Sequence, residues 1–124
     1  MLLVLWLLNI ARVRQAEQQA FARAMPGFAA RIAQTPRTAG QPRLLDWAWK
    51  ETGAAIGAQI FETIVYDESD EIGRPPAALS AGWRARASVR LKDIAERIGH
   101  RNRNDEVDVR RIDDHFYLVT ETIQ

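Results

Sequence analysis

The residues best suited to acid–base chemistry lie near the C-terminal end of the chain, where His115 directly follows Asp113 and Asp114. A carboxylate that holds an imidazole in place is a common arrangement for a general base. Neighbours in a tight turn seldom point at one another, however, and no serine stands in the Gly-x-Ser-x-Gly setting of a hydrolase nucleophile. The sequence therefore predicts no catalytic residue and favours a protein that is not an enzyme.

Metal ligation is the second chemistry to consider, and the acidic run DESDE at 67–71 is the best candidate for it. Its oxygens suit Ca²⁺ or Mg²⁺, but a calcium loop also needs a central glycine and a distal glutamate, which are missing. His100 lies close to Arg101 and Arg103, whose charge opposes a bound cation, and the chain has no cysteine. We expect a solvated acidic loop paired with Arg74, and neither a metal nor a cofactor.

Arginines are frequent between residues 84 and 111, where they suit phosphate binding. The candidates are Arg84, Arg86, Arg90, Arg97, Arg101 and Arg103. Within this stretch, residues 91–99 (LKDIAERIG) resemble the first helix of helix-turn-helix repressors, which implies a second helix that reads DNA. The next residues, HRNRND, depart from that pattern because they have no apolar face. We therefore favour an ordinary amphipathic helix that ends at Gly99, with a nucleic-acid-binding module as the alternative function.

The most unusual feature of the sequence is an apolar run at residues 1–8, MLLVLWLL. As a helix it spans about 12 Å, too short for a hydrocarbon core of ~30 Å, and no basic residue precedes it as in a signal peptide. A translation start further upstream is the condition under which residues 1–10 could be the end of a full transmembrane helix. As written, we expect it to contact a membrane or a protein partner, because large apolar patches are rarely left in water. Burial in the domain's own core is the alternative. The predicted contact residues are Leu2, Leu3, Leu5, Trp6, Leu7, Leu8, Arg12 and Arg14.

Charge is ordered along the chain although the net charge is only +1. Residues 1–43 carry six arginines against a single glutamate, whereas the middle of the chain is acidic. Such an order indicates either pairing within the fold or an arm directed at an anionic partner. Arg12 and Arg14 follow the apolar run, which favours a cytoplasmic location, at the inner face of a membrane if the run touches one.

The predicted fold class is α+β. The 124 residues, 47% of them hydrophobic, suffice for one small domain. We expect a separate N-terminal helix in 1–34, running to about Met25 and broken or kinked at Pro26-Gly27. A linker follows at 35–43, and 44–124 form the domain. In it, a small antiparallel sheet, made of one central strand at 60–67 and a C-terminal hairpin, is covered by helices predicted at 44–58, 77–87 and 89–98.

The C-terminal hairpin is expected to be structural, with strands at 107–112 and 116–123 and a turn near Asp113-Asp114. That turn would leave His115 exposed and would place Val109, Phe116 and Leu118 on one buried face. Three of the tryptophans are expected in the core or at its edge. They are Trp47, Trp49 and Trp83.

These patterns predict a non-enzymatic interaction protein whose apolar N-terminal helix associates with a membrane surface or with a protein partner. Self-association through the same helix is included in that expectation. No small-molecule substrate is indicated, and nucleic acid ranks second among the expected partners.

Overall fold

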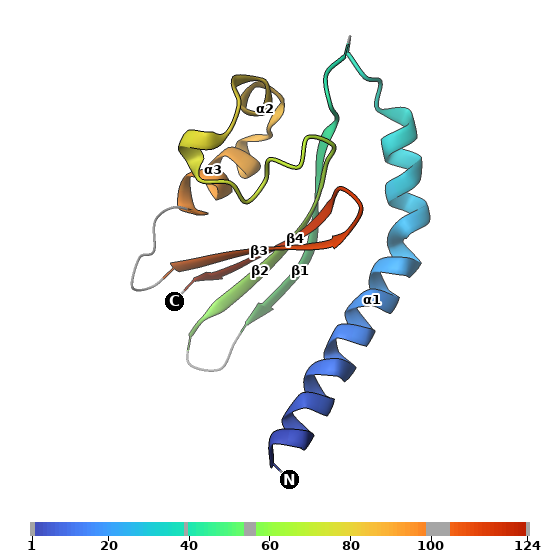
Figure 1. Ribbon diagram of the computed structural model, residues 1–124, viewed down its shortest axis with the longest axis vertical. Coiled ribbons are helices and arrows are strands. Elements are labelled where there is room, and N and C mark those ends of the chain that lie inside the picture. Colours follow the sequence, from blue (N-terminus) through green and yellow to red (C-terminus); the bar gives the residue numbers. More distant parts are fainter. Residues whose placement is uncertain (1, 39, 54–56, 99–104, 124) are drawn as a thin grey trace. The chain divides into compact units, whose positions relative to one another are not determined.

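Two compact units make up the chain, Met1–Pro36 and Arg37–Gln124, and each is described by itself. The computed structural model describes residues 2–38, 40–53, 57–98 and 105–123. In this described part, the first unit holds the helix α1 (Leu2–Gln34), and the second holds four strands, two α-helices and a short 3₁₀ helix (Figure 1). The fold class is therefore α+β with an N-terminal helix, as predicted.

The helix α1 lies within the expected region 1–34, but it continues without interruption through Pro26 to Gln34. A proline inside a helix removes one backbone hydrogen bond and costs about 3 kcal/mol. Alanine, the best helix former, occupies six of the positions from 20 to 33 and favours helix on both sides of the proline. The rings of Phe21 and Phe28, which lie on either side of Pro26 in the sequence, also contact each other, with their centroids 5.8 Å apart. The predicted end near Met25 is wrong, since these local terms outweigh the single lost bond.

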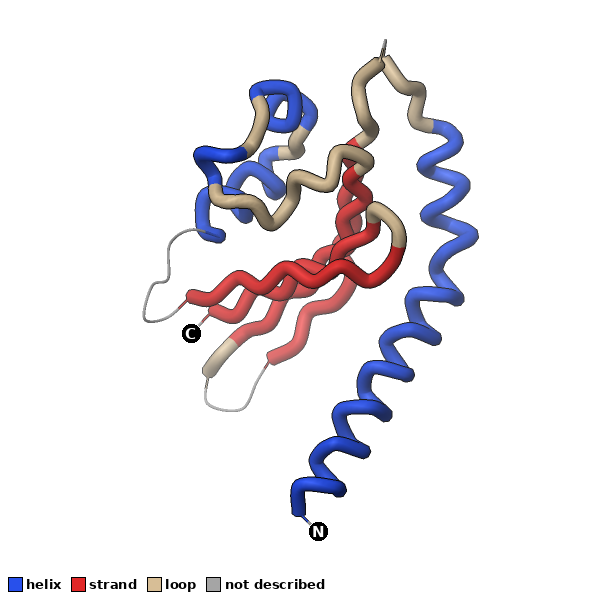
Figure 2. The backbone as a smooth tube through the Cα atoms, viewed as in Figure 1, coloured by secondary structure: helices blue, strands red, loops and turns tan. Residues whose placement is uncertain are grey.

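The sheet of the second unit has four antiparallel strands in the order β1-β2-β4-β3 (Figure 2). Their bounds are Leu44–Gly53 for β1, Gln59–Asp67 for β2, Asp105–Asp113 for β3 and Phe116–Ile123 for β4. The predicted strand at 60–67 and the predicted C-terminal hairpin are confirmed. The hairpin inserts β4 beside β2, so two strands are central instead of one.

The largest correction concerns residues 44–58, which were expected to be a helix. Residues 44–53 form β1 instead, paired along its length with β2 and bulged between Ala48 and Lys50. Leu45, Trp47 and Trp49 repeat at every second position, a pattern typical of a strand, but the 3.6-residue period also fits this short segment. Pairing with β2 decides between the two. The expected packing of a Gly53–Gly57 helix stripe therefore does not exist: Gly53 ends β1, and Gly57 has a φ of +77° in the connection to β2.

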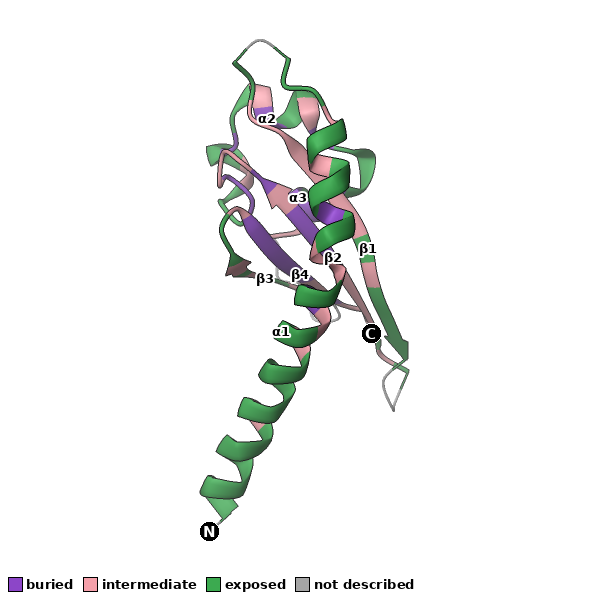
Figure 3. Ribbon diagram, turned by 90° about the vertical axis from the view of Figure 1, so that its right-hand side faces the viewer, coloured by how far each residue is buried: buried purple, intermediate pink, exposed green. Residues whose placement is uncertain are grey.

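One face of the sheet carries the hydrophobic core of this unit. It is covered by the 3₁₀ helix η1 (Pro76–Ala78), α2 (Ala81–Arg86) and α3 (Val89–Ile98). Figure 1 shows α2 and α3 on one side of the sheet, and Figure 3 shows in purple the buried stretches of β2 and β4. The predicted helix at 77–87 is thus split in two, whereas the one at 89–98 is confirmed. Trp83 is fully buried at the centre of the layer. The other buried members are Val65, Ile72, Leu79, Ala87, Leu91, Ile94, Ala95, Tyr117 and Val119.

The register of the hairpin differs from the expected one. The turn residues are Asp114 and His115, and the pairing shifts between Arg111 and Asp113. A one-residue shift moves side chains to the opposite face of a strand. Val109 consequently pairs with Val119 on the core face, whereas Leu118 pairs with Arg110 on the other face. The prediction that Val109 shares a face with Phe116 and Leu118 is wrong for this reason.

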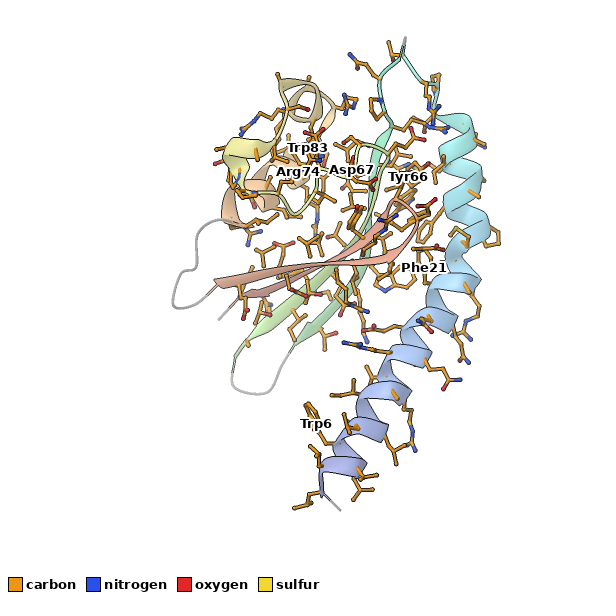
Figure 4. All side chains as sticks on the ribbon, in the orientation of Figure 1. Trp6, Phe21, Tyr66, Asp67, Arg74 and Trp83 are labelled. Atoms are coloured by element: carbon orange, nitrogen blue, oxygen red, sulfur yellow. The ribbon has the colours of Figure 1, made fainter. Side chains whose placement is uncertain are left out.

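A closed ring of hydrogen bonds connects the end of β2 to α2. The Asp67 carboxylate is fully buried and accepts hydrogen bonds from Trp83 Nε1 (3.1 Å) and from the backbone N–H of Glu71 (3.0 Å) and Ile72 (2.8 Å). Glu71 in turn accepts from the N–H and the hydroxyl of Ser80, whose oxygen caps α2 at Trp83 N. Figure 4 shows Asp67 and Trp83 side by side.

The expectation of a solvated acidic loop at 67–71 is therefore wrong. Ser69 fills the remaining acceptor positions of Asp67 through its N–H and hydroxyl. Glu71 is also buried, and Arg74 approaches it at 3.9 Å, as predicted. A buried carboxylate is costly unless donors surround it. These side chains turn inward because the loop backbone and Ser80 supply those donors.

We predict that Asp67→Asn lowers the free energy of unfolding by about 2–4 kcal/mol, measured by urea denaturation. An amide cannot accept from donors on both of its sides, so at least one buried N–H loses its acceptor. The control is Asp93→Asn on α3, where the exposed carboxylate meets Arg97 at 3.2 Å and the change should cost less than about 1 kcal/mol. Equal losses in the two variants would contradict the role given to Asp67.

Candidate functional site

The strongest candidate site is the apolar segment Leu2–Leu8 of α1. Its seven consecutive side chains are all more than half exposed, from 52% at Leu7 to 85% at Leu2. Among the exposed large apolar side chains of the described residues, only Val13 and Val89 lie outside this segment. Successive helix positions are about 100° apart, so seven of them cover every side of the helix. The segment is thus an apolar cylinder, with Trp6 (Figure 4) in its second turn.

Basic side chains follow the apolar segment without an acidic neighbour. Arg12 and Arg14 are exposed, and the first acid along the chain is Glu17. Neither arginine, nor Arg23 further along α1, forms an ion pair with a described residue. No acid among the described residues therefore neutralises these three cations.

The arginines at the C-terminal end of the basic region 1–43, in contrast, form ion pairs within the fold. Arg37 and Arg43 both bind the carboxylate of Glu68, at 2.6 and 3.1 Å, and the Tyr66 hydroxyl donates to it at 2.9 Å. Burial alone would raise the pKa of Glu68, but these hydrogen bonds outweigh it and hold the pKa far below its usual range. Glu68, in the acidic middle of the chain, thus pairs with Arg37 and Arg43, whereas Arg12, Arg14 and Arg23 pair with no acid among the described residues.

The predicted nucleic-acid candidates do not form one unpaired basic patch in the described residues. Arg84 pairs with Glu96 at 3.6 Å, and Arg90 approaches the buried Glu121 at 3.6 Å while donating to Thr63. Arg97 binds Glu121 and Asp93. Arg86 has a buried Nε without a partner. Arg101 and Arg103 lie outside the described residues.

The helix-turn-helix resemblance is not accompanied by that arrangement in the described chain. The apolar side of α3, with Leu91, Ile94 and Ala95, packs into the core against the sheet. After residues 99–104, which the structure does not describe, the chain continues as β3 from Asp105. The interpretation of 89–98 as an ordinary amphipathic helix agrees with this packing.

His115 has a carboxylate partner, but neither of the two expected ones. Its Nδ1 lies 2.9 Å from Oδ1 of Asp70, which also accepts from the Tyr117 hydroxyl at 2.7 Å. Asp114 pairs with Arg111 instead. Asp70 and His115 both have positive φ, +56° and +61°, a conformation that costs energy in residues other than glycine. The contact fixes the acidic loop to the β3–β4 turn, and it spans 45 residues, so no local pattern could have revealed it.

Each of the three serines of the chain forms hydrogen bonds that stabilise the fold. Ser69 donates to Asp67, Ser80 bridges Glu71 and α2, and Ser88 accepts the N–H of Leu91 at the start of α3. In the described residues, no group of three or more histidine and acidic side chains is placed to hold a metal ion. Nor is any described helix both long enough and apolar enough for a membrane crossing.

Comparisons with known proteins do not assign the chain to a family. No family model matches it, and no curated protein or solved structure is significantly similar to it.

The Asp70–His115 contact leads to a prediction about pH. The hydrogen bond to Asp70 raises the pKa of His115 above its ordinary value of 6.5. Burial would raise the pKa of Asp70, but hydrogen bonds from Tyr117 and His115 outweigh it and hold the pKa below 3.8. The contact therefore stabilises the fold fully between pH 3.8 and pH 6.5, the ordinary pKa values of the aspartate and the histidine. The stabilisation decreases as the pH rises through the raised pKa of His115, or falls through the lowered pKa of Asp70.

The test compares the free energy of unfolding of the wild type and of His115→Asn, by urea denaturation. Asparagine tolerates the positive φ, so the substitution removes the charge contact with little backbone strain. We expect the difference between the two proteins to be larger at about pH 5.5 than at about pH 9. A difference that is the same at both pH values would show that the contact does not depend on the charge of His115.

Proposed function

We propose that this chain is a non-enzymatic protein that attaches to a membrane surface through the apolar segment Leu2–Leu8. The observation that carries the proposal is the exposure of seven consecutive apolar side chains on all sides of one helix. A groove on a protein partner covers one stripe of a helix, at positions i, i+3, i+4 and i+7. Lipid acyl chains surround an inserted helix completely, which fits a cylinder better than a stripe.

The energy of this attachment is sufficient for reversible binding. Removing a leucine or valine side chain from water stabilises by about 1.5–3 kcal/mol, so the partly exposed segment contributes on the order of 10 kcal/mol before the entropy cost of binding. Trp6 adds a side chain suited to the membrane interface. In the proposal Arg12 and Arg14 keep the following chain on the cytoplasmic side, at the inner face of the membrane.

We predict that the full chain co-floats with lipid vesicles and that Leu3→Asp with Leu7→Asp reduces the bound fraction at least about tenfold, since acidic side chains are costly in the apolar layer. The control is Val89→Asp, which adds an acid at an apolar position on α3 that is more exposed than Leu3 and Leu7. It should float as the wild type does.

Two results would contradict the proposal. One is vesicle binding that the Leu3→Asp, Leu7→Asp variant retains. The other is a wild type that does not float but forms oligomers in sedimentation experiments, with the same variant monomeric. That second result would assign the apolar segment to self-association.

A further inference from the structure

We infer that α1 enters the bilayer steeply, end-on, and that Arg12 and Arg14 bind the phosphates of anionic lipids at the level where the apolar segment ends. The inference rests on the proposed membrane attachment and adds its orientation and its lipid class. It is carried by where the charged side chains stand around and along the helix.

The apolar segment and the two arginines together favour end-on entry over an orientation in the plane of the membrane. Positions two apart on an α-helix are about 200° apart around its axis, so Arg12 and Arg14 project from nearly opposite sides. A helix lying flat would leave one side of the apolar segment in water, and it could keep both arginines out of the hydrocarbon only at its two flanks. A helix that enters end-on places both at nearly the same depth, about 3 Å apart along the axis.

The position of the arginines along the helix agrees with an end-on entry. The seven residues of the apolar segment span about 10 Å, which lies within the hydrocarbon thickness of a bilayer. Arg12 follows Leu8 by four residues, or about 6 Å. Its guanidinium therefore reaches the headgroup level while the apolar segment stays within the acyl chains. Long arginine side chains adjust to that level by extending toward the interface.

The lipid class follows from the strength of the apolar contact and from charge. The segment offers an apolar contact comparable with one myristoyl chain, which alone gives only marginal, reversible binding, so a second attraction is needed for a stable attachment. The exposed arginine pair, with no acid among residues 2–16, supplies it to an anionic leaflet. Arginine also matches phosphate oxygens with two parallel hydrogen bonds.

Arg23 provides a matched control on the same helix. It is exposed like Arg14 but lies about 13 Å further along the axis, beyond the ~8–10 Å over which salt lets charges interact. End-on insertion therefore leaves Arg23 outside the reach of the headgroups. A helix lying flat would place it at the same surface.

The experiment measures partition coefficients of the full chain on phosphatidylcholine vesicles with and without phosphatidylglycerol. We expect the anionic lipid to strengthen binding, and Arg14→Gln to weaken it on anionic vesicles by about fivefold. Arg12→Gln with Arg14→Gln should weaken it about 25-fold, whereas Arg23→Gln should change it less than about twofold. The effect of Arg14→Gln should vanish on pure phosphatidylcholine.

Each other outcome is decisive. Equal losses in Arg14→Gln and Arg23→Gln would overturn the end-on orientation. Equal binding to both kinds of vesicle would overturn the anionic lipid class, and both results leave the membrane attachment itself intact. Failure of the wild type to bind either vesicle would instead refute the proposed function, and the inference with it.

Discussion

The Asp67 carboxylate, buried at the end of β2, is the group on which the architecture of the second unit depends. Its two oxygens accept five hydrogen bonds, two from Ser69 and one each from Glu71, Ile72 and Trp83. These contacts fix the path of the chain as it leaves the sheet and hold Trp83 at the centre of the core. A buried carboxylate of this kind tolerates little change, because every lost donor leaves an unpaired polar group in an apolar surrounding. The helical layer is thus attached to the sheet by polar contacts as well as by apolar packing.

The distribution of charge separates two kinds of arginine. Arg37 and Arg43 share Glu68, and Arg90 and Arg97 share Glu121, so their charges are used to satisfy buried or half-buried acids. The arginines near the apolar segment have no such partner among the described residues. Pairing within the fold accounts for the residues from Arg37 onward, and an anionic partner is proposed only for the first part of α1.

In the proposed attachment, α1 contacts the membrane and the second unit does not. The second unit has a core of its own on one face of its sheet, centred on Trp83, and its serines and loop carboxylates serve to hold that structure. In the proposal, the interaction is made by α1, where the apolar segment and two arginines follow one another within about three and a half turns of helix. This order of apolar and basic side chains is the one expected for the boundary between acyl chains and headgroups.

The sequence by itself determined the features that depend on local pattern. The strand at 60–67, the amphipathic helix at 89–98 and the apolar helix at the N-terminal end follow from periodicity and composition, as does the α+β class, whereas the exposure of that apolar helix is seen only in the structure. Tertiary structure decided what local pattern leaves open. Trp47 and Trp49 fit both a helix and a strand, and hydrogen bonds to β2 select the strand. The hairpin register changed because a bulge near Ile112 reverses the faces. His115 contacts Asp70 rather than Asp113 or Asp114. A contact between residues 45 positions apart depends on how the chain folds back, which no local spacing encodes.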